Sequence, residues 1–180
     1  MLAYKCFNKG LINRYGKKFE VGKKYIAEGI IKYGNNGNGF HSALRLEDTL
    51  IYFDSFNNEI DICLVDITGQ IIEGTREIDD GYYDLYSSSE MTILKVLTRE
   101  EIINYALNLN IEETRKFILG YKLTKEEIEL FENRFKKEPR VLAALEYYQK
   151  NNKYIYENYY ETYYSKDKYK NITLTHKKNK

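Results

Sequence analysis

The chain has no tryptophan, one proline, two cysteines and two histidines among its 180 residues. No apolar run approaches the roughly 18 residues that a membrane-spanning helix needs, and the first residues lack the apolar segment of a secretory signal. Cys6 and Cys63 are too few for a disulfide framework, and each lies in an apolar strand pattern typical of a buried residue. These absences exclude a membrane protein, a secreted disulfide scaffold and a structural zinc module, and they predict a cytoplasmic location.

Charge is balanced overall but uneven along the chain. The 28 basic and 27 acidic side chains give a net charge of +1, yet residues 1–45 carry +7, residues 46–97 carry −10 and residues 98–180 carry +4. A basic segment of this kind attracts polyanions such as nucleic acids. Lysines on strands can equally keep an exposed sheet face soluble, so both interpretations stay open.

The first third of the sequence predicts short strands. Leu2–Phe7, Phe19–Val21 and Tyr25–Tyr33 are apolar segments separated by glycines, a pattern typical of hairpins. A loop rich in Gly and Asn follows at residues 34–39. Apolar residues spaced i, i+4 and i+7 then predict a helix over about residues 43–54, with Ser42 as its N-cap.

A second group of strands is expected before residue 97. Residues 59–68 and 70–74 suggest a hairpin that turns at Thr68–Gly69, and residues 91–96 suggest another strand. The intervening residues 75–89 combine acidic, tyrosine and serine residues, which favours a loop or an irregular strand.

The remainder of the chain predicts helices. Thr98 with Glu101, and Thr124 with Glu127, have the spacing of capping boxes. We expect helices over residues 100–109 and 111–120, and a third from residue 124 that Pro139 ends near Lys137. A fourth helix is expected from Val141 as far as Tyr164, followed by a frayed basic tail over residues 165–180. The fold class is therefore α+β: an N-terminal antiparallel sheet lobe with one helix (residues 1–97), followed by a C-terminal helical lobe (residues 98–164).

His41 is the one histidine placed where it could carry out acid–base chemistry. It lies between the glycine-rich loop and the expected helix start, where an anion could bind. Lys32 or Arg45 would stabilise the charge that develops on a phosphodiester, and Tyr25 or Tyr52 would orient it. This set predicts metal-independent RNA cleavage if the protein is an enzyme. The alternative is that His41 is a structural hydrogen-bonding residue.

Two surfaces are candidates for binding. The basic one would contact RNA or an RNA-guided effector complex through Lys5, Lys17, Lys18, Lys23 and Lys24. The acidic segment 73–84 would instead mimic a nucleic acid toward a protein partner, as in a non-enzymatic inhibitor or adaptor. Its carboxylates could also bind a hard cation, but they lack calcium-loop spacing, so we predict no metal site and no cofactor. The acidic residues are Glu73, Glu77, Asp79, Asp80 and Asp84.

Several motifs follow one another in a recognisable order along residues 3–105. They are Tyr4–Leu11, Phe19–Tyr25, Gly39–Ala43, Asp48 with Leu50–Phe53, the strands at Ile60–Gly69 and Met91–Leu97, and the helix start at Leu97–Ile102. This order resembles a phage- and prophage-associated domain of unknown function. The chain is also similar, more distantly, to anti-CRISPR proteins that act on a type II effector or its guide RNA. The resemblance implies a mobile-element-encoded antagonist of a nucleic-acid-based host defence.

Overall fold

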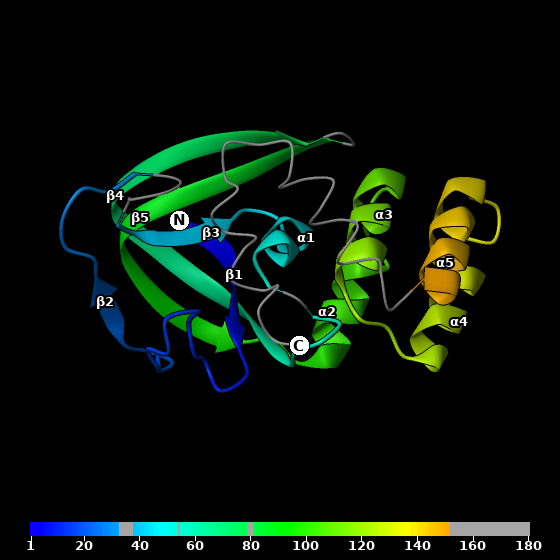
Figure 1. The fold of residues 1–180 in the computed structure, drawn as a ribbon, viewed down its shortest axis with the longest axis horizontal. Coiled ribbons are helices and arrows are strands. Elements are labelled where there is room, and N and C mark those ends of the chain that lie inside the picture. Colours follow the sequence, from blue (N-terminus) through cyan, green and yellow to red (C-terminus); the bar gives the residue numbers. More distant parts are fainter. Residues whose placement is uncertain (33–37, 54, 79–80, 152–180) are drawn as a thin grey trace.

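The computed structural model describes residues 1–32, 38–53, 55–78 and 81–151, and it confirms the α+β fold class (Figure 1). Five antiparallel strands form one sheet in the order β2-β5-β3-β1-β4. They are β1 (Leu2–Asn8), β2 (Lys24–Ile26), β3 (Phe40–Ala43), β4 (Ile60–Ile78) and β5 (Gly81–Val96). Because β4 also pairs with β5, the strands β1, β3, β5 and β4 close into a ring.

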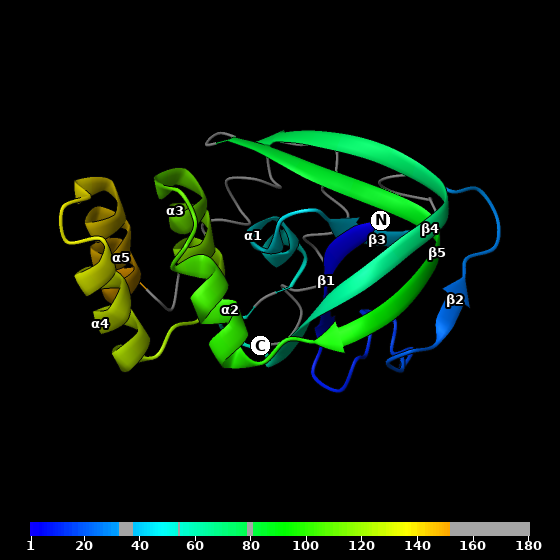
Figure 2. The same cartoon turned by 180° about the vertical axis from the view of Figure 1, so that it is seen from behind.

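The helices gather beside one face of this curled sheet (Figure 2). A short helix α1 (Leu46–Thr49) and the 3-10 turn η1 (Leu50–Tyr52) lie between the sheet and the longer helices. The longer helices are α2 (Arg99–Ala106), α3 (Ile111–Gly120), α4 (Lys125–Arg134) and α5 (Pro139–Asn151). In both views β2 lies at the opposite end of the molecule from α4 and α5.

Two hydrophobic clusters hold these layers together. The first lies inside the curled sheet and contains Phe7, Phe19 and Tyr25 together with β4 and β5 residues. The second joins the outer face of the sheet to the helices, and it includes Ile62 from β4 and Phe117 from α3. Both cysteines are free and buried, one in each cluster, which confirms their expected role as small core residues.

The helical half follows the local signals in the sequence closely. Thr98 and Thr124 each cap a helix through a complete capping box, as predicted. Helix α3 has the predicted bounds, whereas α2 ends at Ala106, before the expected residue 109. Pro139 begins α5, the position at which a missing N–H does no harm, and α4 already ends at Arg134. The expected continuation to Tyr164 and the tail over 165–180 lie outside the described residues.

The helix predicted over about 43–54 is present in part, as α1 and η1 over residues 46–52, but its start and its Ser42 cap are wrong. Ser42 is a residue of β3, and α1 begins only at Leu46, with Arg45 at the N-cap and no side-chain cap. The i, i+4 pattern did identify Leu46 and Leu50 as core residues. Residues 40–43 form a strand rather than a helix because their backbone pairs with β5 and, at Ala43, with β1. A local sequence pattern does not reveal such pairing with distant residues.

The β4–β5 hairpin is longer and more regular than predicted. Thr68–Gly69 is not a hairpin turn but the site of a bulge, where Gly69 has a φ of +74° and the register shifts. The strand pairing continues to Ile78 and Gly81, so the segment 75–89, predicted to be a loop or an irregular strand, belongs to this hairpin. Of the strand expected over 25–33, the structure has the short β2 and an isolated bridge from Ile31 to Asn38. Of the strand expected over 19–21, it has an isolated bridge from Val21 to Ile93.

Candidate nucleic-acid interface

The segment between β1 and β2 is fixed to the sheet by one buried carboxylate. Asp61, 7% exposed, accepts hydrogen bonds from the backbone N–H groups of Gly10 and Leu11 at 2.7 and 3.1 Å. The same carboxylate forms an ion pair with Lys9 at 3.0 Å. Phe19 then inserts into the core inside the sheet, so the exposed residues that follow Leu11 project from an anchored base.

Lys17 and Lys23 both contact one aromatic pair. The rings of Phe19 and Tyr25 are 4.6 Å apart. The Lys17 ammonium lies 5.5 and 5.7 Å from the two ring centres, and the Lys23 ammonium lies 5.7 Å from that of Tyr25. These cation–π contacts hold the charges of both lysines over the same part of the sheet.

Four of the five predicted RNA-contacting lysines are exposed side chains of this segment. Lys23 pairs with Glu20 at 3.2 Å and Lys24 with Glu90 at 2.8 Å, in exposed ion pairs that contribute little and that a polyanion can displace. We call the exposed cations of this segment the basic surface. It consists of Arg14, Lys17, Lys18, Lys23 and Lys24.

Lys5 is placed differently from the other four lysines. Its side chain is partly buried, and its ammonium donates a hydrogen bond to the backbone carbonyl of His41. Burial, followed by the positive charge of Arg14, lowers the pKa of Lys5 to about 8. Lys5 therefore lies beneath the basic surface rather than on it.

Of the four predicted catalytic residues, His41 and Tyr52 come together, and Lys32 joins them through its backbone. His41 lies in β3 with its ring 6.2 Å from that of Tyr52, at an interplanar angle of 27°. Burial is the main cause that lowers the pKa of His41 to about 4, and the charges of Lys5 and Arg14 lower it further, while a hydrogen bond with the Lys32 backbone raises it. With that pKa, only about one imidazole in a thousand is protonated at pH 7. This fraction does not favour a role as general acid.

The anion site expected beside His41 is not formed by the neighbouring helix. Helix α1 has four residues and begins at Leu46, five positions after His41. Arg45 does not complete the catalytic group either, because its guanidinium is engaged by carboxylates of another cluster.

The burial of His41 predicts a specific loss of stability in acid. Its pKa in the folded state, about 4, is below the ordinary value of about 6.5, so the unfolded chain takes up the proton first as the pH falls. Folding stability is therefore lost between pH 6.5 and pH 4, by about 3 kcal/mol from this group. The variant His41→Gln should lose less stability than the natural chain over that range, measured by urea unfolding. Parallel pH profiles for the two chains would contradict this expectation.

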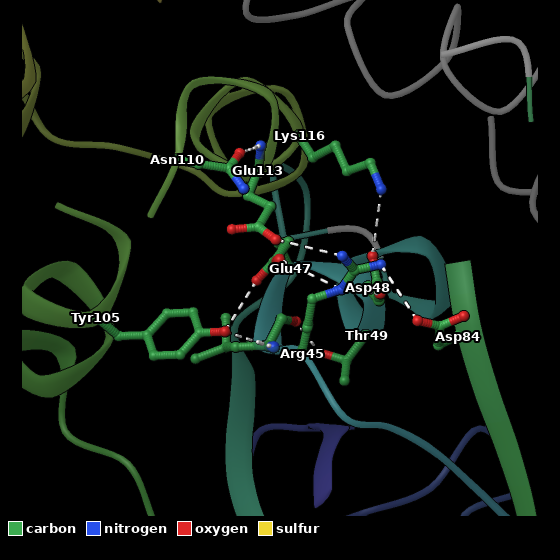
Figure 3. A network of polar contacts seen from close by, with 10 residues as sticks. Arg45, Glu47, Asp48, Thr49, Asp84, Tyr105, Asn110, Glu113 and Lys116 are labelled. Carbon is green, nitrogen blue, oxygen red and sulfur yellow. Dashed lines mark hydrogen bonds and ion pairs between the residues drawn. The ribbon is translucent and has the colours of Figure 1, made fainter. Parts of the chain in front are cut away.

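Arg45 lies at the centre of an ionic cluster that joins the sheet to the helices (Figure 3). Its guanidinium lies 3.0 Å from Asp48 in α1, 3.2 Å from Glu113 in α3 and 3.6 Å from Asp84 in β5. The Lys116 ammonium of α3 lies 3.6 Å from the same Asp48.

Glu47 completes the cluster and was missed by the sequence analysis. It is 1% exposed, and its carboxylate accepts a hydrogen bond of 3.1 Å from the Tyr105 hydroxyl of α2. Burial, with smaller contributions from the charges of Asp48 and Glu113, raises the pKa of Glu47 to about 7. Burial also raises the pKa of Asp48, although Lys116 and Arg45 act against it.

A hollow of about 950 Å³ opens beside this cluster, between the start of α3 and the connection from α4 to α5. Arg45, Glu113 and Lys116 are among its lining residues, but Glu47 and Asp48 are not. The two buried carboxylates thus hold the cations Arg45 and Lys116 of the wall in place, and they do not themselves line the hollow. No group of three or more potential metal ligands occurs in the part of the chain that the structure describes.

The acidic segment 73–84 lies in the β4–β5 hairpin. The structure describes the side chains of Glu73, which accepts a hydrogen bond from the Tyr86 hydroxyl at 3.3 Å, and of Asp84, which pairs with Arg45. Asp79 and Asp80 lie outside the described residues. A nucleic-acid-mimicking role of this segment stays a prediction.

Comparison with known proteins bears on the sheet and its first helices. Every described helix is too short or too polar to cross a membrane. No curated protein and no solved structure gives a match. One family, described as a domain of unknown function (DUF7666), matches residues 1–105, which include all five strands and nearly all of α2. Since this match covers more than half of the chain, the protein belongs to the DUF7666 family.

Proposed function

We propose that this protein binds RNA, alone or within an RNA–protein effector, through the basic surface. The observation that carries the proposal is the gathering of exposed cations around the Phe19–Tyr25 pair. Neutralising phosphates with lysine and arginine releases counterions, which drives binding to nucleic acids.

The arrangement of the basic surface supports binding rather than a purely solubilising role. Lysines that only keep a strand soluble need no fixed position, whereas Lys17 and Lys23 are both held against Tyr25. The base of the segment is anchored at Asp61 and at the buried Phe19, so the charges form a preorganised surface. Preorganisation reduces the entropy lost when a partner binds.

The proposal includes metal-independent cleavage of the bound RNA. His41, Tyr52 and the Lys32 backbone lie together, but the imidazole is uncharged at neutral pH and Arg45 is engaged elsewhere. Incubating labelled RNA with the protein, with and without EDTA, tests this part. If the natural chain forms a product in the presence of EDTA and His41→Ala forms none, the metal-independent reaction is established.

The wider role that we propose is antagonism of an RNA-guided host defence by a mobile-element protein. It rests on the resemblance of the N-terminal motifs to a phage-associated domain and on a more distant similarity of the chain to anti-CRISPR proteins. It is tested by adding the purified chain to a type II effector that is cutting its DNA target. Inhibition that depends on the basic surface would support the role, and unimpaired cutting at saturating protein would remove it.

Charge reversal at Lys17 and Lys18 tests the binding proposal directly. We expect Lys17→Glu with Lys18→Glu to weaken RNA binding by at least about tenfold at low salt, because favourable interactions with phosphates become repulsive. The dependence of log affinity on log salt should also become shallower, by about 0.7 for each phosphate of a single strand that is no longer neutralised. Fluorescence anisotropy with a labelled 12-nucleotide RNA, over a series of salt concentrations, measures both.

The matched control makes the same change of charge at the other end of the molecule. Lys136 and Lys137 are exposed and lie between α4 and α5, so Lys136→Glu with Lys137→Glu should leave RNA affinity within about twofold. Equal losses of affinity in the two double variants would indicate a general effect of net charge and would refute a localised surface. If only the acidic segment 73–84 proves sensitive to substitution, the partner is a protein instead.

A further inference from the structure

The tip of the segment between β1 and β2 is a tight turn centred on Tyr15. Isolated bridges from Ile12 to Asn8 and to Lys18 hold the base of the turn. The Asn13 side-chain oxygen accepts hydrogen bonds from the backbone N–H groups of Tyr15 and Lys17, at 3.0 and 2.9 Å.

Backbone hydrogen bonds close the same turn. The Asn13 N–H donates to the Lys17 carbonyl at 2.9 Å, and the Gly16 N–H donates to the Asn13 carbonyl at 3.0 Å. Gly16 has a φ of +83°, a conformation that residues with a Cβ adopt only with strain. The position of Tyr15 is therefore set by its neighbours rather than by packing of its own ring.

The Tyr15 ring projects into solvent from this turn. Its side chain is 85% exposed, more than any other large apolar residue that the structure describes. A tyrosine that served the core would bury its ring, as Tyr25 does at 9% exposure ten residues later. The turn thus presents an aromatic face that the fold itself does not use.

The residues around Tyr15 in the sequence are cations. Arg14 precedes it, and Lys17 and Lys18 follow the glycine of the turn, so the exposed ring lies within the basic surface. A positive groove combined with an exposed aromatic ring is the arrangement by which proteins bind single-stranded nucleic acids: cations follow the backbone, and unpaired bases stack on the ring. In a duplex the bases are already stacked on one another and cannot stack on a side chain.

We propose that Tyr15 is a stacking site for an unpaired base and that it makes the basic surface selective for single-stranded RNA. This inference rests on the proposed RNA binding and adds the class of RNA bound and a residue that recognises it. Stacking of one base on an aromatic side chain contributes about tenfold or more in affinity. The cations alone would bind single and double strands alike.

The test compares variants of Tyr15 on two RNAs. Tyr15→Ala and Tyr15→Leu should each weaken binding of a 12-nucleotide single-stranded RNA by about tenfold, whereas Tyr15→Phe should retain it. Binding of a 12-base-pair RNA duplex should be unchanged in all three. Tyr147→Ala is the matched control, because Tyr147 lies on α5 and is 43% exposed, and it should bind both RNAs like the natural chain.

The outcomes separate this inference from the proposed function. If Tyr15→Ala binds the single strand normally while Lys17→Glu with Lys18→Glu does not, RNA binding stands and the stacking site is wrong. Equal losses of affinity for the single strand and the duplex would also overturn the stacking site, because the loss of stacking on an unpaired base cannot weaken binding of a duplex. If the natural chain binds neither RNA, the proposed function itself fails.

Discussion

Replacing Arg45 by methionine is expected to lower the free energy of unfolding by about 3–5 kcal/mol at pH 8. The guanidinium lies between Asp48, which is fully buried, and the less buried Glu113 and Asp84. Methionine keeps most of the side chain's length but removes the charge, which leaves buried carboxylates with too little positive charge around them. Removing one partner of a buried ion pair is strongly destabilising for this reason.

The same substitution should be better tolerated in mild acid. Burial raises the pKa of Glu47 to about 7 and raises that of Asp48 as well. At pH 5 the carboxyl group of Glu47 is largely protonated even in the natural chain, so less negative charge depends on Arg45. The difference between the two chains in urea unfolding should thus be smaller at pH 5 than at pH 8.

Arg140→Met provides the control for the Arg45 experiment. Arg140 is 64% exposed and pairs with Glu112, itself 47% exposed, so its removal should change stability by no more than about 0.5 kcal/mol. If Arg45→Met were equally destabilising at both pH values, the effect would come from packing and not from charge.

Phe117→Ala should destabilise the protein by about 3–5 kcal/mol and should do so for the sheet and the helices together. Phe117 is fully buried in α3, with its ring centre 5.0 Å from that of Tyr121 and 6.0 Å from that of Phe131. The cluster that contains it includes Cys6 and Ile62 of the sheet, so a cavity there weakens both halves.

Amide hydrogen exchange measures this coupling residue by residue. Protection in β4 and in α3 should fall by the same free energy in Phe117→Ala if residues 1–97 and 98–151 unfold as one unit. The control Leu130→Ala, on α4 and 50% exposed, should alter neither by more than about 0.5 kcal/mol. Protection that fell in α3 alone would show that the sheet folds without the helices.

The helical half was the more predictable part of the fold because its signals are local. A threonine and a glutamate three residues apart start α2 and α4, and both capping boxes form in the structure. The sheet depends on partners distant in sequence. Ser42 looks like a helix cap when its neighbours alone are considered, but its backbone pairs opposite Tyr86. Gly69 looks like a turn, but it is a bulge within a strand that has β5 beside it.

The candidate sites also differ in how far the sequence could predict their residues. Exposed lysines of the basic surface could be identified from composition, because charge runs are visible in the sequence. Glu47 could not, because nothing in a short polar stretch reveals that a glutamate will be 1% exposed and will contact Tyr105. Tyr15 was one of 19 tyrosines, and only the turn around it distinguishes it from those that fill the core.

Closure of the sheet into a ring also determines when the chain can fold during its synthesis. Strand β1 pairs along its length with β4, with Leu2 opposite Asp66, and β3 pairs with the middle of β5. Strand β1 therefore lacks its β4 partner until residue 66 has been synthesised, and β2 and β3 lack their β5 partner until residue 92 has been. Helices α2 to α5 can form afterwards from local contacts. Such separations slow folding relative to a helical protein of equal size. Until its partner is made, the apolar β1 segment stays exposed, and exposed apolar surface of this kind makes a growing chain prone to aggregation.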